Sequence, residues 1–228
     1  MPTETPNSHP DPRESKHYYF HKTLFRRVAT PTLNFLFNLF STIQVNDLEN
    51  MPGEGPVVLI ANHMTIYDMF PMQFILSRSI FFMGKAELYK NPLVDVILRQ
   101  LGSFPVERGA RDNWALEHAK ELLLRGQVLG IFPEGTRSRG SGLRPAKTGA
   151  ARLAISVNCP IISMGVIGTE GLFNRFPQRS QVTINVGVPI YPQPSDTVLE
   201  LTDRMMFSLA ELLPMRLRGV YAQHPAGF

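Results

Sequence analysis

The chain has 228 residues, of which 43% are hydrophobic, so it is long enough to bury one sizeable core and is expected to form one domain. Its formal net charge of +4 favours anionic partners such as phosphate, a coenzyme or lipid head groups, but it also suits nucleic acid and does not discriminate between them. Cys159 is the only cysteine, which excludes disulfides within the chain and cysteine-rich metal sites and indicates a reducing compartment.

Residues 1–17 are predicted to form a disordered tail. The first dozen of them are polar and rich in proline, a composition that cannot bury enough apolar surface to fold. They also lack the basic-then-apolar pattern of a secretion signal.

Residues 18–50 are predicted to form an amphipathic helical segment. A helical pattern with aromatic and basic side chains runs from Tyr18 to Val45 and is interrupted by Pro31. Five apolar side chains fall on one helical face: Leu33, Leu36, Phe37, Phe40 and Ile43. The apolar stretch is well short of the ~20 residues needed to span a bilayer, so a transmembrane helix is not expected. Basic residues precede the apolar stretch, as they do in helices that lie in the membrane interface. A helix that packs on the core is an equally good interpretation of the residues alone.

Residues 51–228 alternate between apolar runs and helical patterns. Strands are expected at Gly55–Ala61, Ser79–Lys85, Ser103–Arg108, Val128–Pro133, Pro160–Ile167 and Gln181–Ile190. Helices are expected at Ile66–Leu76, Pro92–Leu101, Asn113–Arg125 and Thr148–Val157, and from Thr197 to about Leu217. This alternation predicts an α/β fold in which helices flank a central, mostly parallel mixed sheet.

Four polar side chains follow the ends of predicted strands. His63, Lys85, Arg108 and Glu134 each lie at or just past such an end. In open α/β sheets, sites gather at the carboxyl ends of the strands. These side chains are therefore candidates for one functional site.

His63 and Asp68 are candidates for a general base and the carboxylate that orients it. They are five positions apart, which on a regular helix places them about 140° out of phase, so they cannot share a helical face. If the chain instead leaves the strand at Asn62 and a helix starts near Thr65, Asp68 can return toward the imidazole. A carboxylate there would accept the proton on one ring nitrogen and leave the other nitrogen as a base. A pair with this spacing also arises by chance, so it gains weight only from segments further along the chain.

Three motifs stand in order along the chain. The first, N-H-x-x-x-x-D, is formed by Asn62, His63 and Asp68; the second, K-x-E-L followed by V-x-R, by Lys85, Glu87, Leu88, Val106 and Arg108; the third, F-P-E-G-T-R-S, by residues 132–138. A weaker fourth, a proline that opens an apolar strand, is at Pro160. With these motifs the chain resembles the glycerolipid acyltransferases typified by 1-acylglycerol-3-phosphate acyltransferase, over roughly residues 53–168.

The resemblance implies that residues 51–228 form a catalytic domain. It would move a fatty acyl group from acyl-CoA or acyl carrier protein to the free hydroxyl of lysophosphatidate, giving phosphatidate, with His63 as base and Asp68 as its orienter. The implied substrate-binding residues are Lys85, Arg108, Glu134, Gly135, Thr136 and Arg137, among which the arginines suit phosphate better than lysine does. No metal is expected, and no cofactor other than the acyl donor.

The resemblance also implies partners and a location. The partners are the acyl donor, lysophosphatidate and a phospholipid surface, and nucleic acid is not expected among them. The implied location is the cytoplasmic face of the cell membrane, as a peripheral protein.

Other functions stay open at this point. Within the same family, the chain could act on another lysolipid or on an amino-acid lipid. It could be a thioesterase or lipid hydrolase in which His63 activates water in place of an alcohol. It could also be a non-catalytic lipid-binding module.

Several single residues have a structural interpretation. Lys85 could simply pair with Glu87 or Glu107. Cys159 is expected to be a buried structural residue, and the chain has no G-x-S-x-G nucleophile motif. On one predicted helix, Trp114 is expected to pack and His118 to lie on the surface.

Overall fold

The central sheet follows from the apolar runs of the sequence. The computed structural model describes residues 11–107, 112–173 and 178–223. In this part of the chain one sheet is formed by β1 (Ser41–Asn46), β2 (Val57–Ala61), β3 (Ile80–Lys85), β4 (Ser103–Val106), β5 (Val128–Ile131), β6 (Ile161–Ile167) and β7 (Ser180–Val186). The strand order is β1-β7-β6-β2-β5-β3-β4, and the β6–β7 pair alone is antiparallel among these described strands. The predicted α/β fold with a mostly parallel mixed sheet is confirmed.

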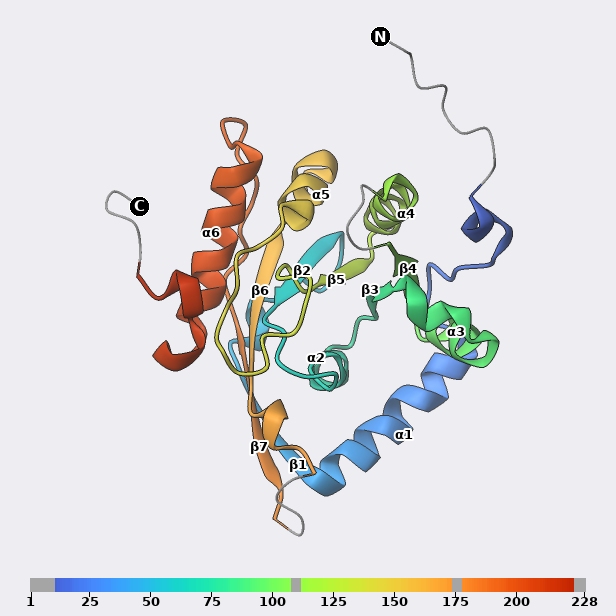
Figure 1. The fold of residues 1–228 in the computed structure, drawn as a ribbon, viewed down its shortest axis with the longest axis horizontal. Coiled ribbons are helices and arrows are strands. Elements are labelled where there is room, and N and C mark those ends of the chain that lie inside the picture. Colours follow the sequence, from blue (N-terminus) through green and yellow to red (C-terminus); the bar gives the residue numbers. More distant parts are fainter. Residues whose placement is uncertain (1–10, 108–111, 174–177, 224–228) are drawn as a thin grey trace.

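Helices cover both faces of the sheet (Figure 1). The α-helices are α1 (Leu24–Phe40), α2 (Met69–Ile75), α3 (Pro92–Gln100), α4 (Asn113–Leu124), α5 (Gly149–Val157) and α6 (Val198–Glu211). The 3-10 helices are η1 (Pro12–Ser15), η2 (Leu48–Asn50), η3 (Ala86–Lys90), η4 (Thr169–Gly171), η5 (Met215–Leu217) and η6 (Gly219–Tyr221). The helices predicted after residue 51 are all present. The last is shorter than expected because Pro214 cannot continue an α-helix.

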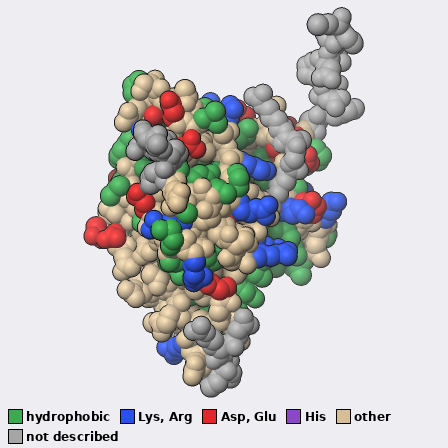
Figure 2. Space-filling view, turned by 60° about the vertical axis from the view of Figure 1, so that its left-hand side comes forward, with side chains coloured by type: hydrophobic (Ala, Val, Ile, Leu, Met, Phe, Trp, Pro, Cys, Tyr) green, Lys and Arg blue, Asp and Glu red, His purple; other side chains and the backbone are tan. Residues whose placement is uncertain are grey.

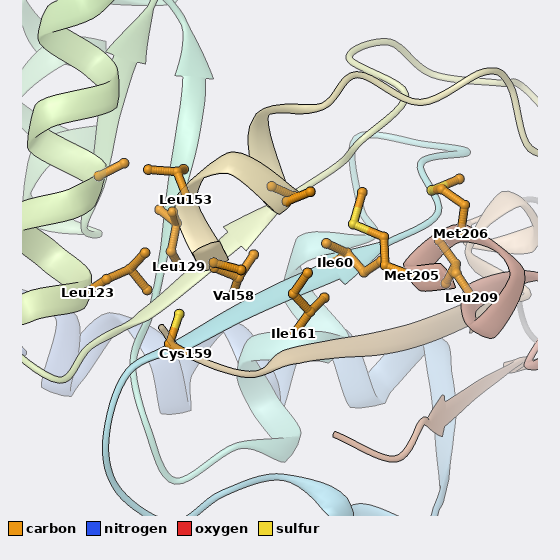
Figure 3. Packing of buried hydrophobic residues seen from close by; sticks show 14 of the residues in the cluster. Val58, Ile60, Leu123, Leu129, Leu153, Cys159, Ile161, Met205, Met206 and Leu209 are labelled. Carbon is orange, nitrogen blue, oxygen red and sulfur yellow. The ribbon is translucent and has the colours of Figure 1, made fainter. Parts of the chain in front are cut away.

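The hydrophobic core lies on both faces of the sheet, since successive side chains of a strand point to opposite faces. On one face, Val58 and Ile60 of β2 pack with residues of α4, α5 and α6, as Figure 3 shows. On the other face, Val57 and Leu59 pack with Met72 of α2. The strand β2 is buried along its whole length, so the residues that follow it start from a fixed position.

The predicted N-terminal helix differs from the structure at both ends. The helix α1 begins at Leu24, with Thr23 as its N-cap, and continues through Pro31, where an interruption was expected. It ends at Phe40, and the next six residues form β1, which pairs in parallel with β7. Ile43 and Val45 are partly buried and alternate with exposed Thr42 and Gln44, as strand residues do. The helical interpretation of Ile43 was therefore wrong.

The helix α1 leaves much of its apolar surface uncovered. Phe37 is buried against the sheet, whereas Leu24, Val28 and Phe35 are 79%, 63% and 66% exposed. Leu36, which was predicted on the same face as Phe37, is also exposed. None of the helices in the described ranges is long and apolar enough to cross a membrane.

Residues 11–17 differ from the disordered tail that was predicted for them. This segment contains η1 and makes two salt bridges to the rest of the chain, each 2.6 Å long: Arg13 to Asp112 and Lys16 to Asp95. The prediction of disorder rested on the small amount of apolar surface that this segment can bury. Salt bridges to the folded domain can hold a segment in place without such burial. The first ten residues of the predicted tail lie outside the described residues.

Candidate active site

The contact predicted between His63 and Asp68 is present. His63 lies two residues after β2, and Asp68 directly precedes α2. His63 Nδ1 and Asp68 Oδ2 are 2.9 Å apart. The helix begins at Met69, later than expected, because Asp68 first closes a tight turn by accepting the backbone N–H groups of Met64 and Thr65 at 2.7 and 2.9 Å.

Five donors converge on the carboxylate of Asp68, which is fully buried. Its Oδ2 accepts from His63 and from the two backbone N–H groups, and its Oδ1 accepts the hydroxyl groups of Thr65 at 3.0 Å and Thr169 at 2.5 Å. Because an ionised carboxylate only accepts hydrogen bonds, the proton of the neutral imidazole lies on Nδ1. The Nε2 atom of His63 then has a free lone pair, as a general base requires.

Phe132 fixes the plane of the imidazole. Its ring stacks on that of His63, with the centroids 4.1 Å apart and the planes inclined by 16°. The ring of Phe82 stacks in turn on Phe132, with centroids 6.0 Å apart. The first residue of the F-P-E-G-T-R-S motif therefore holds the candidate base from one side.

Glu134 joins the loop of this motif to the candidate base. Its Oε1 accepts the backbone N–H of His63 at 2.9 Å, and its Oε2 accepts that of Arg144 at 3.1 Å. In the same loop, the backbone N–H of Ser138 donates to the carbonyl oxygen of His63 at 2.7 Å. Burial raises the pKa of the Glu134 carboxyl above its usual value, while these backbone hydrogen bonds oppose the shift. The resemblance placed Glu134 among the substrate-binding residues, but in this structure both of its oxygens bind the protein backbone.

Three other predicted binding residues, Lys85, Thr136 and Arg137, are exposed at the surface. Lys85 pairs with Glu87 at 3.1 Å, and both side chains are about half exposed, in agreement with the structural interpretation of Lys85. Arg108 lies outside the described residues. The roles of these residues in binding stay predictions.

A cavity of about 290 Å³ adjoins His63. Its apolar walls come from β3, β4, β5, α4 and α5 and include Met83, Val106, Leu116, Ile131 and Leu153. Gly135 of the motif and Lys147 also line it. Gly135 has a φ of +68°, which glycine adopts at little cost, and a Cβ at this position would lie 3.0 Å from Cε of Lys147. A cavity of this character can hold the hydrocarbon part of a substrate beside the base.

Three contacts of the site were not predicted from the sequence. They are the stacking of Phe132 on His63 and the hydroxyl donors Thr65 and Thr169. A threonine three positions before an aspartate in a turn is a recognisable signal for a local hydrogen bond, so Thr65 could have been found. Thr169 is 101 positions away from Asp68, and no local pattern indicates such a contact.

The sequence analysis also predicted whether two residues outside the site, His118 and Cys159, are exposed or buried. His118 was expected at the surface, but its ring stacks on Trp114, with centroids 5.0 Å apart, and contacts Phe104. Burial lowers the pKa of His118 to about 4. Cys159 is buried as predicted, and burial raises the pKa of its thiol to about 11. In residues 11–107, 112–173 and 178–223, no three His, Cys, Asp or Glu side chains gather as metal ligands would.

The fold and the site together define a class of protein. It is an α/β domain in which a His–Asp pair follows a central strand, is held by the F-P-E-G-T-R-S loop and adjoins an apolar cavity. The model of the acyltransferase family matches residues 42–167, which is more than half of the chain. The chain therefore belongs to the acyltransferase family.

The proteins most informative for comparison are 1-acyl-sn-glycerol-3-phosphate acyltransferases. The chain is 31% identical to the one from Escherichia coli over 166 residues, covering 72% of this chain and 65% of that protein. It is 26% identical over 196 residues to a chloroplastic one from Brassica napus, covering 78% of this chain and 56% of the plant protein, so it spans little more than half of that relative. The crystal structure of the 1-acyl-sn-glycerophosphate (LPA) acyltransferase PlsC from Thermotoga maritima has a TM-score of 0.67 at 25% identity, over 82% of this chain and 77% of that one.

Proposed function

We propose that this protein transfers a fatty acyl group from an acyl thioester to the free hydroxyl of lysophosphatidate, giving phosphatidate. The observation that supports it most is the His63–Asp68 pair, 2.9 Å apart, beside a cavity with mostly apolar walls. A base next to an apolar cavity meets the two needs of lipid acylation, proton removal and a place for a hydrocarbon chain. The names of the relatives from Escherichia coli and Brassica napus point to the same reaction.

The chemistry follows from the tautomer of His63. Its Nε2 removes the proton of the acceptor hydroxyl as that oxygen attacks the thioester carbonyl, because an uncharged alcohol is a poor nucleophile near neutral pH. A C–O bond forms and the C–S bond breaks when the tetrahedral intermediate collapses. The imidazolium then gives its proton to the departing thiolate, so His63 returns to its starting state. Asp68 stabilises the imidazolium between these two steps.

Phosphate recognition is assigned to three basic residues of the sequence motifs. In the proposal, Arg137 and Arg108 bind the phosphate of the acceptor, since the planar guanidinium can bind two oxygens at once. Lys85 contributes charge, and the loop at Gly135 and Thr136 contributes the backbone N–H of Thr136, since that of Gly135 already donates to the carbonyl oxygen of Phe132 at 3.0 Å. The donor is acyl-CoA or acyl carrier protein, and no further cofactor takes part.

The proposal places the protein at a phospholipid surface on the cytoplasmic face of the cell membrane, and α1 supports this. The exposed apolar side chains of α1 include Leu24, Val28 and Phe35, and two exposed basic residues, Lys22 and Arg27, lie close to them in the sequence. A helix of this kind lies in the membrane interface, where anionic lipids attract its basic residues. Figure 2 shows Lys and Arg side chains close together on one face of the molecule, beside exposed hydrophobic side chains.

A product assay tests the proposed reaction. Purified protein is incubated with labelled acyl-CoA, or labelled acyl carrier protein, and lysophosphatidate dispersed in detergent. We expect labelled phosphatidate. Labelled free fatty acid as the main product would instead show a thioesterase, and the absence of any product with both donors would favour a lipid-binding module. If labelled product forms only with another lysolipid or with an amino-acid lipid, that lipid is the acceptor and the protein is an acyltransferase with a different substrate.

The membrane contact is tested with charged substitutions on α1. Val28→Asp and Phe35→Asp replace side chains that are 63% and 66% exposed, and Leu199→Asp on α6 is the matched control at 67% exposure. We expect both α1 variants, but not the control, to lose binding to vesicles of phosphatidylglycerol and phosphatidylethanolamine in a flotation assay. Undiminished binding of the α1 variants would place the contact elsewhere.

A further inference from the structure

Thr169 connects Asp68 to a part of the chain that none of the motifs covers. It is the first residue of η4, which follows β6, and its hydroxyl donates to Asp68 Oδ1 at 2.5 Å. The exposed fraction is 0% for Asp68 and 1% for Thr169, so the hydrogen bond is shielded from water. The residue also lies just beyond residues 42–167, which the family model matches. Neither the motifs nor the family match therefore assigns a role to Thr169.

The two oxygens of Asp68 have different partners. Oδ2 accepts hydrogen bonds from Nδ1–H of His63 and from the two backbone N–H groups of the turn. These bonds fix one oxygen only, so the plane of the carboxylate group also depends on the donors that hold Oδ1. Thr65, one donor to Oδ1, belongs to the same turn as Asp68 and moves with it. Thr169 comes instead from the end of β6, the strand that pairs with β2 in the sheet. Thr169 is therefore the donor to Oδ1 that ties the carboxylate to the sheet.

The backbone before Thr169 is held in one conformation. Gly168 has a φ of +92°, in the left-handed region, and a Cβ at this position would overlap the backbone oxygen of Gln181 in β7. Only glycine allows this close approach of the chain to the neighbouring strand. The hydroxyl of Thr169 is thus presented to Asp68 from a fixed position.

We propose that Thr169 is a positioning residue that orients the Asp68 carboxylate and, through it, keeps the proton of His63 on Nδ1. Thr169 does not touch the substrate in this proposal. Its kinetic consequence rests on the proposed acyl transfer, but its effect on the imidazole does not depend on which substrate is used. Loss of the hydroxyl should therefore change both the tautomer of His63 and the rate of the proton-transfer step.

The test compares the full chain with three variants. Thr169→Val keeps the shape of the side chain without its hydroxyl, and Thr169→Ser keeps the hydroxyl. Thr202→Val is the matched control, because Thr202 is 4% exposed and donates to the backbone oxygen of Val198 within α6, away from Asp68. The tautomer of His63 is read from the ¹⁵N NMR shifts of its ring nitrogens, which are assigned by their loss in His63→Ala.

We expect wild type, Thr169→Ser and the control to show the proton on Nδ1, and Thr169→Val to show a mixture with the Nε2–H tautomer. In the acylation assay, kcat of Thr169→Val should fall about tenfold with KM within twofold of wild type, since the lost contact acts on the base and not on binding. Thr169→Ser should recover most of this loss. If valine impairs folding, Thr169→Ala gives the same comparison without the hydroxyl.

Two results would overturn the proposal. One is a folded Thr169→Val protein with the wild-type tautomer and rate. The other is a loss of rate that serine does not restore or that Thr202→Val reproduces, because that would show a general packing effect. A wild-type protein without transferase activity would overturn the proposed function alone, and the NMR comparison would still decide the role of Thr169.

Discussion

Replacement of Gly135 by alanine tests how the motif loop shapes the cavity. The φ of Gly135 is +68°, in the left-handed region where a residue other than glycine costs roughly 1–2 kcal/mol. The added Cβ would also lie 3.0 Å from Cε and 3.3 Å from Nζ of Lys147, so the lysine side chain must shift by a few tenths of an ångström. Gly140→Ala is the matched control, because Gly140 has a φ of +89° and no atom within 4 Å of a Cβ built on it.

We expect the two variants to lose similar stability but different amounts of activity. The shared backbone cost predicts a fall in Tm of roughly 2–8 °C for a chain of this length, measured by differential scanning calorimetry. Lys147 lines the cavity beside His63, and a misplacement of about 1 Å near reacting groups can cost about a hundredfold in rate. The smaller shift in Gly135→Ala should therefore lower kcat/KM for phosphatidate formation about tenfold. Gly140→Ala should stay within about twofold of wild type.

The comparison separates backbone strain from the contact with Lys147. Equal losses of activity in Gly135→Ala and Gly140→Ala would show that strain in the loop is sufficient to explain them. Wild-type kcat/KM in a folded Gly135→Ala protein would refute the reasoning, because it would mean that the position of Lys147 does not matter for the reaction.

Three further predictions concern the base, the acceptor and the core. Asp68→Asn should lower kcat about a hundredfold in the same assay, because an amide cannot accept all five donors; a wild-type rate would exclude Asp68 as the orienter. Arg137→Ala should lower kcat/KM for lysophosphatidate roughly ten- to a hundredfold, and less for lysophosphatidylethanolamine, whose esterified phosphate has less charge; equal losses would argue against a phosphomonoester site. The pKa of His118 is lowered to about 4, so its neutral form contributes stability that is full above about pH 6.5 and is lost as the pH falls through 4. Chemical denaturation should show a free energy of unfolding about 1–2 kcal/mol lower at pH 5 than at pH 7, with a smaller difference in His118→Phe; equal differences in the two proteins would contradict this role of His118.

The periodicity of the sequence was sufficient for most of the fold, because the buried strands of a parallel sheet are short apolar runs and the helices between them are longer and amphipathic. The strand β1 is the exception. Its six residues directly follow a helix, and Ile43 fits the helical period as well as the strand period. Pairing with β7, more than a hundred residues later, decides between them, and a local pattern cannot contain that information. His118 shows the same limit, since its place on a helix four residues after Trp114 was predictable, but Phe20 and Phe104, which also contact its ring, come from other parts of the chain.

The same limit applies to the candidate site: contacts within one turn were predictable from the sequence, and contacts between strands were not. The contact of His63 with Asp68 depends on a turn of a few residues, so the spacing in the sequence was enough to predict it. Glu134 was placed near the site correctly, but its use as a partner of backbone N–H groups depends on how the motif loop folds over β2. Thr169 reaches Asp68 only because β6 lies next to β2 in the sheet. Contacts of this kind require the strand order, which the sequence alone does not reveal.

His63 is the residue on which the proposed transfer depends. The rate of phosphatidate formation by His63→Ala, measured with labelled acyl-CoA and saturating lysophosphatidate, tests this directly. A positioned base contributes about 10²–10⁴-fold, so kcat should fall by that factor while the variant keeps the Tm of wild type within a few degrees. A folded His63→Ala protein that forms phosphatidate at the wild-type rate would contradict the assignment of His63 as the base.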